Sequence, residues 1–214
     1  MLVPRVSFRH PSGNPSPRTA LLLPGFKRQM SVKSFSPAPG HHKWLEKLEQ
    51  YKPDCLAGSL GQLLFLASLR CSKTVGLASL RHSLVVIFQT EQPWLAREDR
   101  DDLWAAFGLP VYEQIYSVTG LLATECEAHD GLHITPGASW NQDANGELWY
   151  REPPAWWEDR GETFAPSGLF GDVDATPCPC GRPTPRLRIG GPTQRQVLQN
   201  SDVSGLRKAF AEVA

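Results

Sequence analysis

The sequence predicts an α/β protein in which a parallel α/β lobe is followed by a β-rich half with loops. Two observations carry this prediction. Between residues 43 and 120, apolar strand-like runs alternate with amphipathic helical segments, as in parallel sheets joined by crossover helices. After residue 120, short strand-like runs are separated by turn signals such as Asn145-Gly146, and no long helical pattern precedes residue 195.

The positions of the prolines and of the predicted elements divide the chain into segments. Seven prolines before residue 40 interrupt any long helix, although Ala20–Leu23 is a candidate short strand that ends at Pro24. We therefore expect four segments: an irregular Pro-rich arm (1–42), the parallel α/β lobe (43–120), a β-rich region (121–192) and a tail with one or two helical turns (193–214).

Two helices and a short strand open the lobe. Residues 43–51 carry apolar side chains at helical spacing, and the apolar run Cys55–Gly58 predicts a buried strand. Ser59 and Gln62 then match a capping box, because a hydroxyl at the cap is followed three residues later by an amide. The second helix is predicted to continue through Leu63–Leu69.

Two strands flank a third helix in the rest of the lobe. The continuous apolar run Ser83–Phe88 is typical of a strand covered on both faces, and Val111–Tyr116 is the next strand. The helix between them, Arg97–Phe107, is predicted to direct Leu103, Trp104 and Phe107 inward. Gly108 is its expected C-cap. Three strands are predicted in the β-rich region: Leu121–Glu127, Leu132–Thr135 and Glu147–Arg151.

The bulk charge of the chain is balanced, with 22 basic and 22 acidic residues. This balance gives no general attraction to nucleic acid. No signal peptide or membrane-length apolar run is visible at the start of the chain, since Leu21–Leu23 is too short for either. We therefore expect a cytoplasmic, reducing location, no membrane partner, and cysteines that bind metal or stay as thiols.

Four residues of the types that hold zinc lie in polar surroundings. Cys126 and His133 are separated by six residues, and Cys178 and Cys180 by one. Three sulfurs and one imidazole nitrogen form a tetrahedral donor set that zinc favours, and we predict a structural zinc ion here. His129 is a rival for the place of His133.

Two other interpretations of these residues stay open. The cysteines are free thiols in the first. In the second, Cys126 is a nucleophile with His129 as its base and Glu127 nearby, although residues three apart on a strand point to different faces.

Several phrases occur in an order that resembles one enzyme family. They are Tyr51-x-Pro53-x4-Gly58, Phe88-Gln-Thr-Glu91-Gln-Pro93, Phe107-Gly-x-x-Val-Tyr112, Tyr116-Ser-Val-Thr119, Glu125-Cys-Glu-x-x-x-Gly-Leu-His133, Gly146-Glu-Leu148, Gly168-Leu-Phe-Gly-Asp172 and Cys178-Pro-Cys-Gly-Arg182. Their order resembles the adenylate-forming enzymes, specifically the phenylacetate–CoA ligase branch, over about residues 43–190. That branch often carries a metal at the Cys/His positions.

The resemblance also implies nucleotide contacts. Glu91 would lie near the adenine, Tyr116 and Thr119 near the ATP phosphates, Asp172 on the ribose hydroxyls and Arg186 near phosphate or ribose. Two departures weaken this site: the glycine of the adenine phrase is absent, and the acidic residue expected after Thr119 is replaced by Gly120. Asp172 is also explained as an ordinary turn residue beside Gly171.

The resemblance covers an internal part of such an enzyme. Only 42 residues precede it and 24 follow Gly190, which leaves no room for the family's phosphate loop or its mobile lysine-bearing domain. We therefore expect a remnant that is not catalytic by itself and acts as a binding or assembly module, with a homodimer or protein partner on the exposed lobe face. The alternative is a split or weak AMP-forming acyl–CoA ligase subunit that binds ATP or AMP together with a partner chain.

Overall fold

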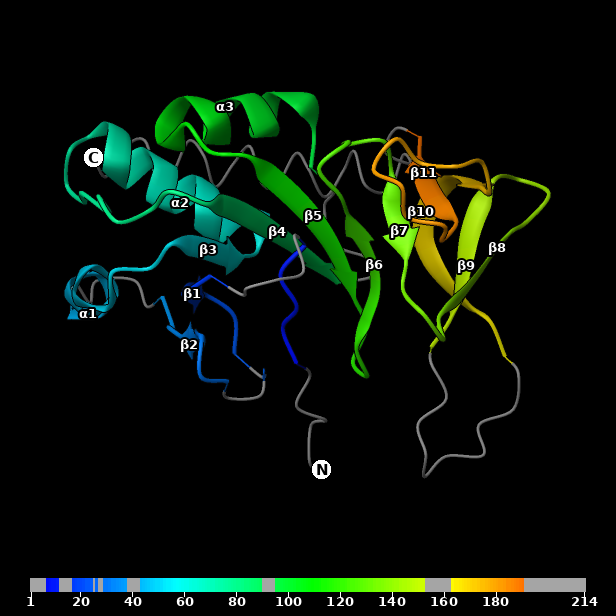
Figure 1. Cartoon of the computed structure of the whole chain (residues 1–214), viewed down its shortest axis with the longest axis horizontal. Coiled ribbons are helices and arrows are strands. Elements are labelled where there is room, and N and C mark those ends of the chain that lie inside the picture. Colours follow the sequence, from blue (N-terminus) through cyan, green and yellow to red (C-terminus); the bar gives the residue numbers. More distant parts are fainter. Residues whose placement is uncertain are drawn as a thin grey trace.

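The structure, a computed structural model, describes residues 7–11, 17–24, 26, 29–37, 43–89, 95–152 and 163–190. The tail predicted at 193–214 and Glu91 lie outside these residues. Within them the named strands form one 11-stranded sheet, in the order β2-β1-β3-β4-β5-β6-β7-β11-β10-β9-β8. Helices gather at one end of the sheet, and β8 to β11 lie at the other (Figure 1).

The first five strands of the sheet are parallel. They are β1 (Thr19–Leu21), β2 (Val32–Ser34), β3 (Cys55–Gly58), β4 (Ser83–Gln89) and β5 (Val111–Tyr116). Pairing of β1 with β2 and β3, of β3 with β4, and of β4 with β5 is parallel throughout. The predicted parallel α/β lobe is confirmed, and the Pro-rich arm contributes two three-residue strands to it.

Three helices cover one face of these strands. They are α1 (Lys43–Tyr51), α2 (Leu60–Cys71) and α3 (Arg97–Phe107). Their buried residues, such as Leu48, Leu63 and Leu103, share one core cluster with alternate residues of β3, β4 and β5. A second cluster on the opposite face includes Phe8 and Tyr116.

The predicted helix caps are present. Ser59 accepts a hydrogen bond from the Gln62 amide while the Gln62 side chain accepts one from the Ser59 amide, and Gly108 adopts the left-handed conformation at φ 65°. The prediction that Trp104 points inward is wrong, because its side chain is 56% exposed. Leu103 and Phe107 are four residues apart and share the buried face of α3, whereas Trp104 is rotated about 100° from Leu103.

The second half of the sheet is antiparallel. Its strands are β6 (Leu121–Glu125), β7 (Leu132–Ile134), β8 (Ser139–Gln142), β9 (Glu147–Arg151), β10 (Ala165–Asp174) and β11 (Arg186–Ile189). The last strand, β11, inserts between β7 and β10. The connection from β6 to β7 therefore lies beside the connection from β10 to β11, and this pairing positions the site described below.

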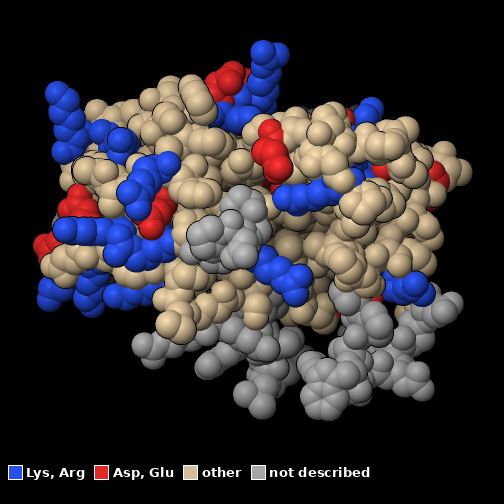
Figure 2. Space-filling view, viewed as in Figure 1, with Lys and Arg blue, Asp and Glu red and all other residues tan. Residues whose placement is uncertain are grey.

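Charge is unevenly spread over the surface. Figure 2 shows Lys and Arg gathered at the end that carries α1 and α2, while the described face over β7 to β11 is mostly uncharged. None of the helices seen in the described residues has the length and apolar character needed to cross a membrane.

Candidate functional site

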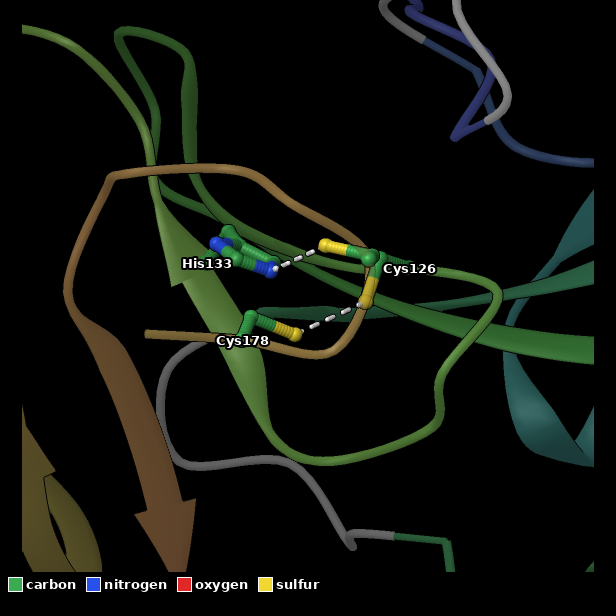
Figure 3. Close-up of side chains that lie close together, drawn as sticks. Cys126, His133 and Cys178 are labelled. Carbon is green, nitrogen blue, oxygen red and sulfur yellow. Dashed lines mark hydrogen bonds between the residues drawn. The ribbon is translucent and has the colours of Figure 1, made fainter. Parts of the chain in front are cut away.

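Four side chains from the two neighbouring connections form one cluster. The ligand atoms of Cys126, His133, Cys178 and Cys180 all lie within 4.8 Å of one another, which is close enough for them to hold a metal ion together. Cys126, His133 and Cys178 are buried and point toward one another (Figure 3). The two sulfurs of Cys126 and Cys178 are 3.7 Å apart, and the Cys180 sulfur is 3.3 Å from His133 Nε2.

Two tight turns present these ligands. After β6, the His129 amide donates to the Cys126 carbonyl at 3.0 Å, and Gly131 follows at φ 86°. A Cβ on Gly131 would approach the Leu187 carbonyl oxygen to 2.7 Å, so only glycine lets β11 come this close. In the second turn the Gly181 amide donates to the Cys178 carbonyl at 2.9 Å.

The ring of His133 is oriented by Thr184. Its Nδ1 atom lies 2.9 Å from the Thr184 hydroxyl and 3.2 Å from the Thr184 carbonyl oxygen. A proton on Nδ1 satisfies that carbonyl and leaves Nε2 as a lone-pair donor toward the cysteines. Burial lowers the pKa of His133, with Arg182 and Arg186 acting in the same direction, so the neutral imidazole needed by a metal is favoured.

The thiols differ in their tendency to ionise. Burial raises the pKa of the Cys126 thiol to about 12, against a hydrogen bond from the Ala128 amide. Burial also acts to raise the pKa of Cys178, but hydrogen bonds from the Cys180 amide and the neighbouring thiols outweigh it, and the net shift is downward. Crowded thiolates repel one another, so a bound cation would stabilise this donor set.

His129 is not part of the cluster. Its ring stacks on Tyr112, with the ring centroids 5.2 Å apart, and its Nδ1 atom is 2.9 Å from Glu125 Oε1. The prediction of His133 as the ligand therefore agrees with the geometry, and His129 is engaged elsewhere. The same contacts hold His129, the base named in the nucleophile interpretation, against Glu125.

Tyr116 and Thr119 lie where β5 ends and the chain turns into β6. Tyr116 is buried, and its hydroxyl accepts from the Arg9 amide at 3.3 Å and donates to Gln114 Oε1 at 3.4 Å. The Thr119 hydroxyl is 3.1 Å from that of Ser117. Both side chains are thus held by protein partners, and the nucleotide contacts implied for them stay predictions.

Asp172 and Arg186 lie on β10 and β11, several strands away from β5 in the sheet. Asp172 is exposed. Arg186 is 1% exposed and forms ion pairs with Asp130 and Asp174, the second at 2.8 Å. A nucleotide contact by Arg186 would require these pairs to open, and its role at phosphate or ribose stays a prediction.

Comparisons with known proteins give the fold a context. No family model matches the sequence, and no curated protein matches it either. Solved structures do match. An open conformation of 2-hydroxyisobutyryl-CoA ligase, in complex with 2-HIB-AMP and CoA, has 18% identity and a TM-score of 0.62 over 82% of this chain and 48% of that one.

Two further structures agree. The amide bond synthetase McbA from Marinactinospora thermotolerans has 15% identity and a TM-score of 0.52, covering 87% of this chain and 42% of that one. The anthranilate CoA ligase AuaEII, in complex with anthranoyl-AMP, has 15% identity and a TM-score of 0.52, covering 80% and 39%. The chain shares its fold with part of these adenylate-forming ligases. It spans less than half the length of each.

Sequence reasoning missed a polar network directly before Cys126. Arg100 Nη2 on α3 lies 2.6 Å from Glu113 Oε1 and 3.2 Å from Glu125 Oε1, and the Glu113 amide donates to Glu125 Oε2 at 2.9 Å. Burial and the neighbouring Glu125 raise the pKa of Glu113 to about 8, with Arg100 opposing them. The network ties α3 to β5 and β6. A signal was present, since Glu113 puts a carboxylate in a strand whose ends are apolar or aromatic.

Proposed function

We propose that this chain is a binding or assembly module that uses part of an adenylate-forming ligase fold and is not catalytic by itself. We further propose that it belongs with the phenylacetate–CoA ligase branch and holds a structural zinc ion at Cys126, His133, Cys178 and Cys180. The cysteine ligands would stay reduced in a cytoplasmic location.

The proposal that the chain is not catalytic by itself rests on the turn between β5 and β6. In the branch that the sequence resembles, this turn supplies a threonine and a glutamate to ATP phosphate and magnesium. Here the Ser117 amide donates to the Gly120 carbonyl at 2.9 Å, the Thr119 hydroxyl contacts Ser117, and no carboxylate follows. Adenylyl transfer depends on positioning and on neutralisation of phosphate charge, and this turn offers neither a carboxylate for the metal ion nor a free hydroxyl.

The donor set supports zinc with a structural role. Three thiolates and one neutral imidazole suit zinc, and Thr184 provides the partner that a zinc-bound imidazole requires on its second nitrogen. Four protein ligands leave no position for a water molecule, so zinc-activated hydrolysis is not expected. The ion would tie the β6–β7 connection to the β10–β11 connection.

Calorimetric titration and an activity assay test the catalytic part. We expect no binding of ATP or AMP in the micromolar range and no pyrophosphate release in the presence of phenylacetate. Micromolar AMP binding together with carboxylate-dependent pyrophosphate release would contradict the proposal. For zinc, native mass spectrometry should show one ion per chain that is lost in Cys178→Ser and retained in Cys71→Ser, an exposed cysteine outside the cluster.

The second candidate is a subunit of a split AMP-forming acyl–CoA ligase. It is supported by the fold that the chain shares with part of ligases whose structures hold AMP adducts. In that case the missing activity would appear only when a second chain is added. A homodimer or protein complex on the exposed lobe face fits either candidate, and light scattering after size-exclusion chromatography measures the mass.

A further inference from the structure

A cavity of about 420 Å³ lies beside the Cys/His cluster and has no role in the function proposed above. Its walls come from the N-terminal segment at residues 9–11, from β5, β6 and β7, and from the segment that follows Cys180. Its volume falls in the range of small-molecule sites. Among the described residues that the ligase resemblance assigns to nucleotide, none lines this cavity, although Tyr116 contacts Arg9 and Gln114 in its wall.

The lining of this cavity carries positive charge without a carboxylate. Arg9 and Arg182 line it, and no Asp or Glu does. Arg9 forms no ion pair with any other residue in the described part of the chain. Arg182 donates to the Pro11 carbonyl at 2.7 Å, and Glu127, its acidic partner among the described residues, is 3.6 Å away and mostly exposed. Exposed pairs of this kind neutralise little charge, so the cavity suits an anion.

The histidines in the lining are assigned no part of this charge. Burial and the neighbouring His82 lower the pKa of His10 to about 4, and His133 is one of the residues proposed to hold zinc. The charge therefore comes from the two guanidinium groups. Two such groups match the double negative charge of a phosphate monoester above its second pKa of about 6 better than the single charge of a carboxylate.

The polar part of the wall is already satisfied by protein partners. The Gln114 side chain donates to the Arg9 carbonyl at 2.7 Å and to the Thr124 hydroxyl at 3.1 Å, and the Thr184 hydroxyl contacts His133. These bonds hold the N-terminal segment against β5, where the dark-blue trace runs beside the sheet (Figure 1). The wall is thus fixed in place before a ligand arrives, which lowers the cost of binding.

The remaining lining is apolar, with Leu121, Ile134 and Pro136 beside the polar residues. An apolar surface next to two arginines fits a ligand with a charged end and an apolar body. We propose that this cavity binds a small organic phosphate monoester, with Arg9 and Arg182 at the phosphate and Leu121 and Ile134 against the organic group. The inference rests on the proposed binding role and gives that role a ligand class.

Three probes separate the parts of this proposal. Calorimetry on the zinc-loaded full chain would use phenyl phosphate, inorganic phosphate (the same charge without a body) and benzoate (a body with one charge). We expect phenyl phosphate to bind saturably, with inorganic phosphate and benzoate each at least about tenfold weaker. Loss of one charge-assisted hydrogen bond should weaken phenyl phosphate about tenfold in Arg9→Gln and in Arg182→Gln. Arg81→Gln, which alters an exposed arginine in the lobe, should leave binding unchanged.

The controls keep the outcomes distinct. Circular dichroism and zinc content should match the parent chain in Arg182→Gln. If they do not match, the test rests on Arg9→Gln, which alters an exposed residue. Absence of saturable phenyl phosphate binding, equal affinity for inorganic phosphate or benzoate, or binding unaffected by Arg9→Gln would each overturn the proposal. Any of these results without pyrophosphate release would leave the non-catalytic module in place, whereas carboxylate-dependent pyrophosphate release overturns that module whatever the cavity binds.

Discussion

The two halves of the sheet are stabilised by different means. The parallel half is covered by three helices, and its main core cluster contains 20 buried apolar residues in the described part of the chain. The corresponding cluster of the antiparallel half contains eight. Apolar burial is the dominant favourable term in folding, so the antiparallel half has much less of it to offset its conformational entropy.

Polar groups take a larger share in that second half. The Cys/His cluster joins two of its connections, and Arg186 joins Asp130 and Asp174 while lying almost wholly inside the protein. Buried polar networks of this type stabilise a structure only when all their members are satisfied. From this difference we expect the parallel half to fold from its sequence pattern and the antiparallel half to depend on the zinc ion proposed for its Cys/His cluster.

Removal of the proposed zinc ion should have the largest effect among the tests that compare the two halves. Structural zinc contributes about 10–16 kcal/mol in small peptides, which is comparable with the whole stability of a domain. A strong chelator should therefore raise amide hydrogen exchange across β6, β7, β10 and β11, while β3 and β4 stay protected. Cys71→Ser, treated in the same way, is the control for cysteine loss. Equal exchange in both halves, or no change in either, would count against a metal-dependent second half.

Truncation of a buried side chain in the lobe core tests the parallel half of the sheet. Leu63 on α2 is fully buried, and Leu63→Ala should lower the free energy of unfolding by about 2–5 kcal/mol. Urea titration measures this loss, and zinc stoichiometry should be unchanged because the cluster lies in the other half. Leu64→Ala, at a partly buried neighbour, should cost less. Loss of zinc in Leu63→Ala would show that the two halves do not respond separately.

The same contrast explains which elements the sequence predicted. In the lobe, α1, β3, α3 and β5 were predicted with the observed bounds, because apolar runs, helical spacing and a C-terminal glycine act locally. In the antiparallel half, β10 was missed. It contains Pro166, Gly168 and Gly171, which signal turns, and its pairing with β9 shifts register between Pro166 and Leu169. A bulged strand of this kind is stabilised by its neighbours and not by its own residues.

Long-range partners also explain what was found and missed in the site. Residue type and spacing, together with the resemblance, pointed to Cys126, His133, Cys178 and Cys180, with His129 left as a rival for the place of His133. By contrast, β11 reads Arg-Leu-Arg-Ile, and nothing local indicates that Arg186 is buried between two aspartates. The link between Arg100 on α3 and two glutamates on separate strands likewise becomes visible only once the strands are paired.

A pH dependence should arise where the two halves meet, at Glu113. Its folded pKa is raised from 4.5 to about 8, so the native state binds a proton more tightly than the unfolded chain. The resulting stability is complete below about pH 4.5 and is lost as pH rises through 8. Relative to Glu113→Gln, the parent chain should lose about 1–3 kcal/mol of unfolding free energy between pH 5 and 8.5.

Urea titrations of both proteins at the two pH values measure this difference. Zinc affinity also varies with pH, but it affects the parent chain and the variant alike. Glu127→Gln, at an exposed carboxyl of the adjacent turn, is the matched control. A parent chain and Glu113→Gln with parallel pH profiles would contradict a raised pKa at Glu113.

The smallest expected effect concerns a single helix cap in the lobe. Ser59 Oγ accepts from the Gln62 amide at 3.5 Å, and the Gln62 side chain accepts from the Ser59 amide at 3.0 Å. Ser59→Ala should lower the free energy of unfolding by about 1 kcal/mol, because an amide in the first turn of α2 loses its partner. Ser68→Ala, at an exposed position of the same helix, should be neutral or slightly stabilising, since alanine is the better helix former. Equal losses in the two variants, measured by urea titration, would mean that the capping box does not stabilise α2. The lobe would then depend on apolar burial alone, which would sharpen its contrast with the polar second half.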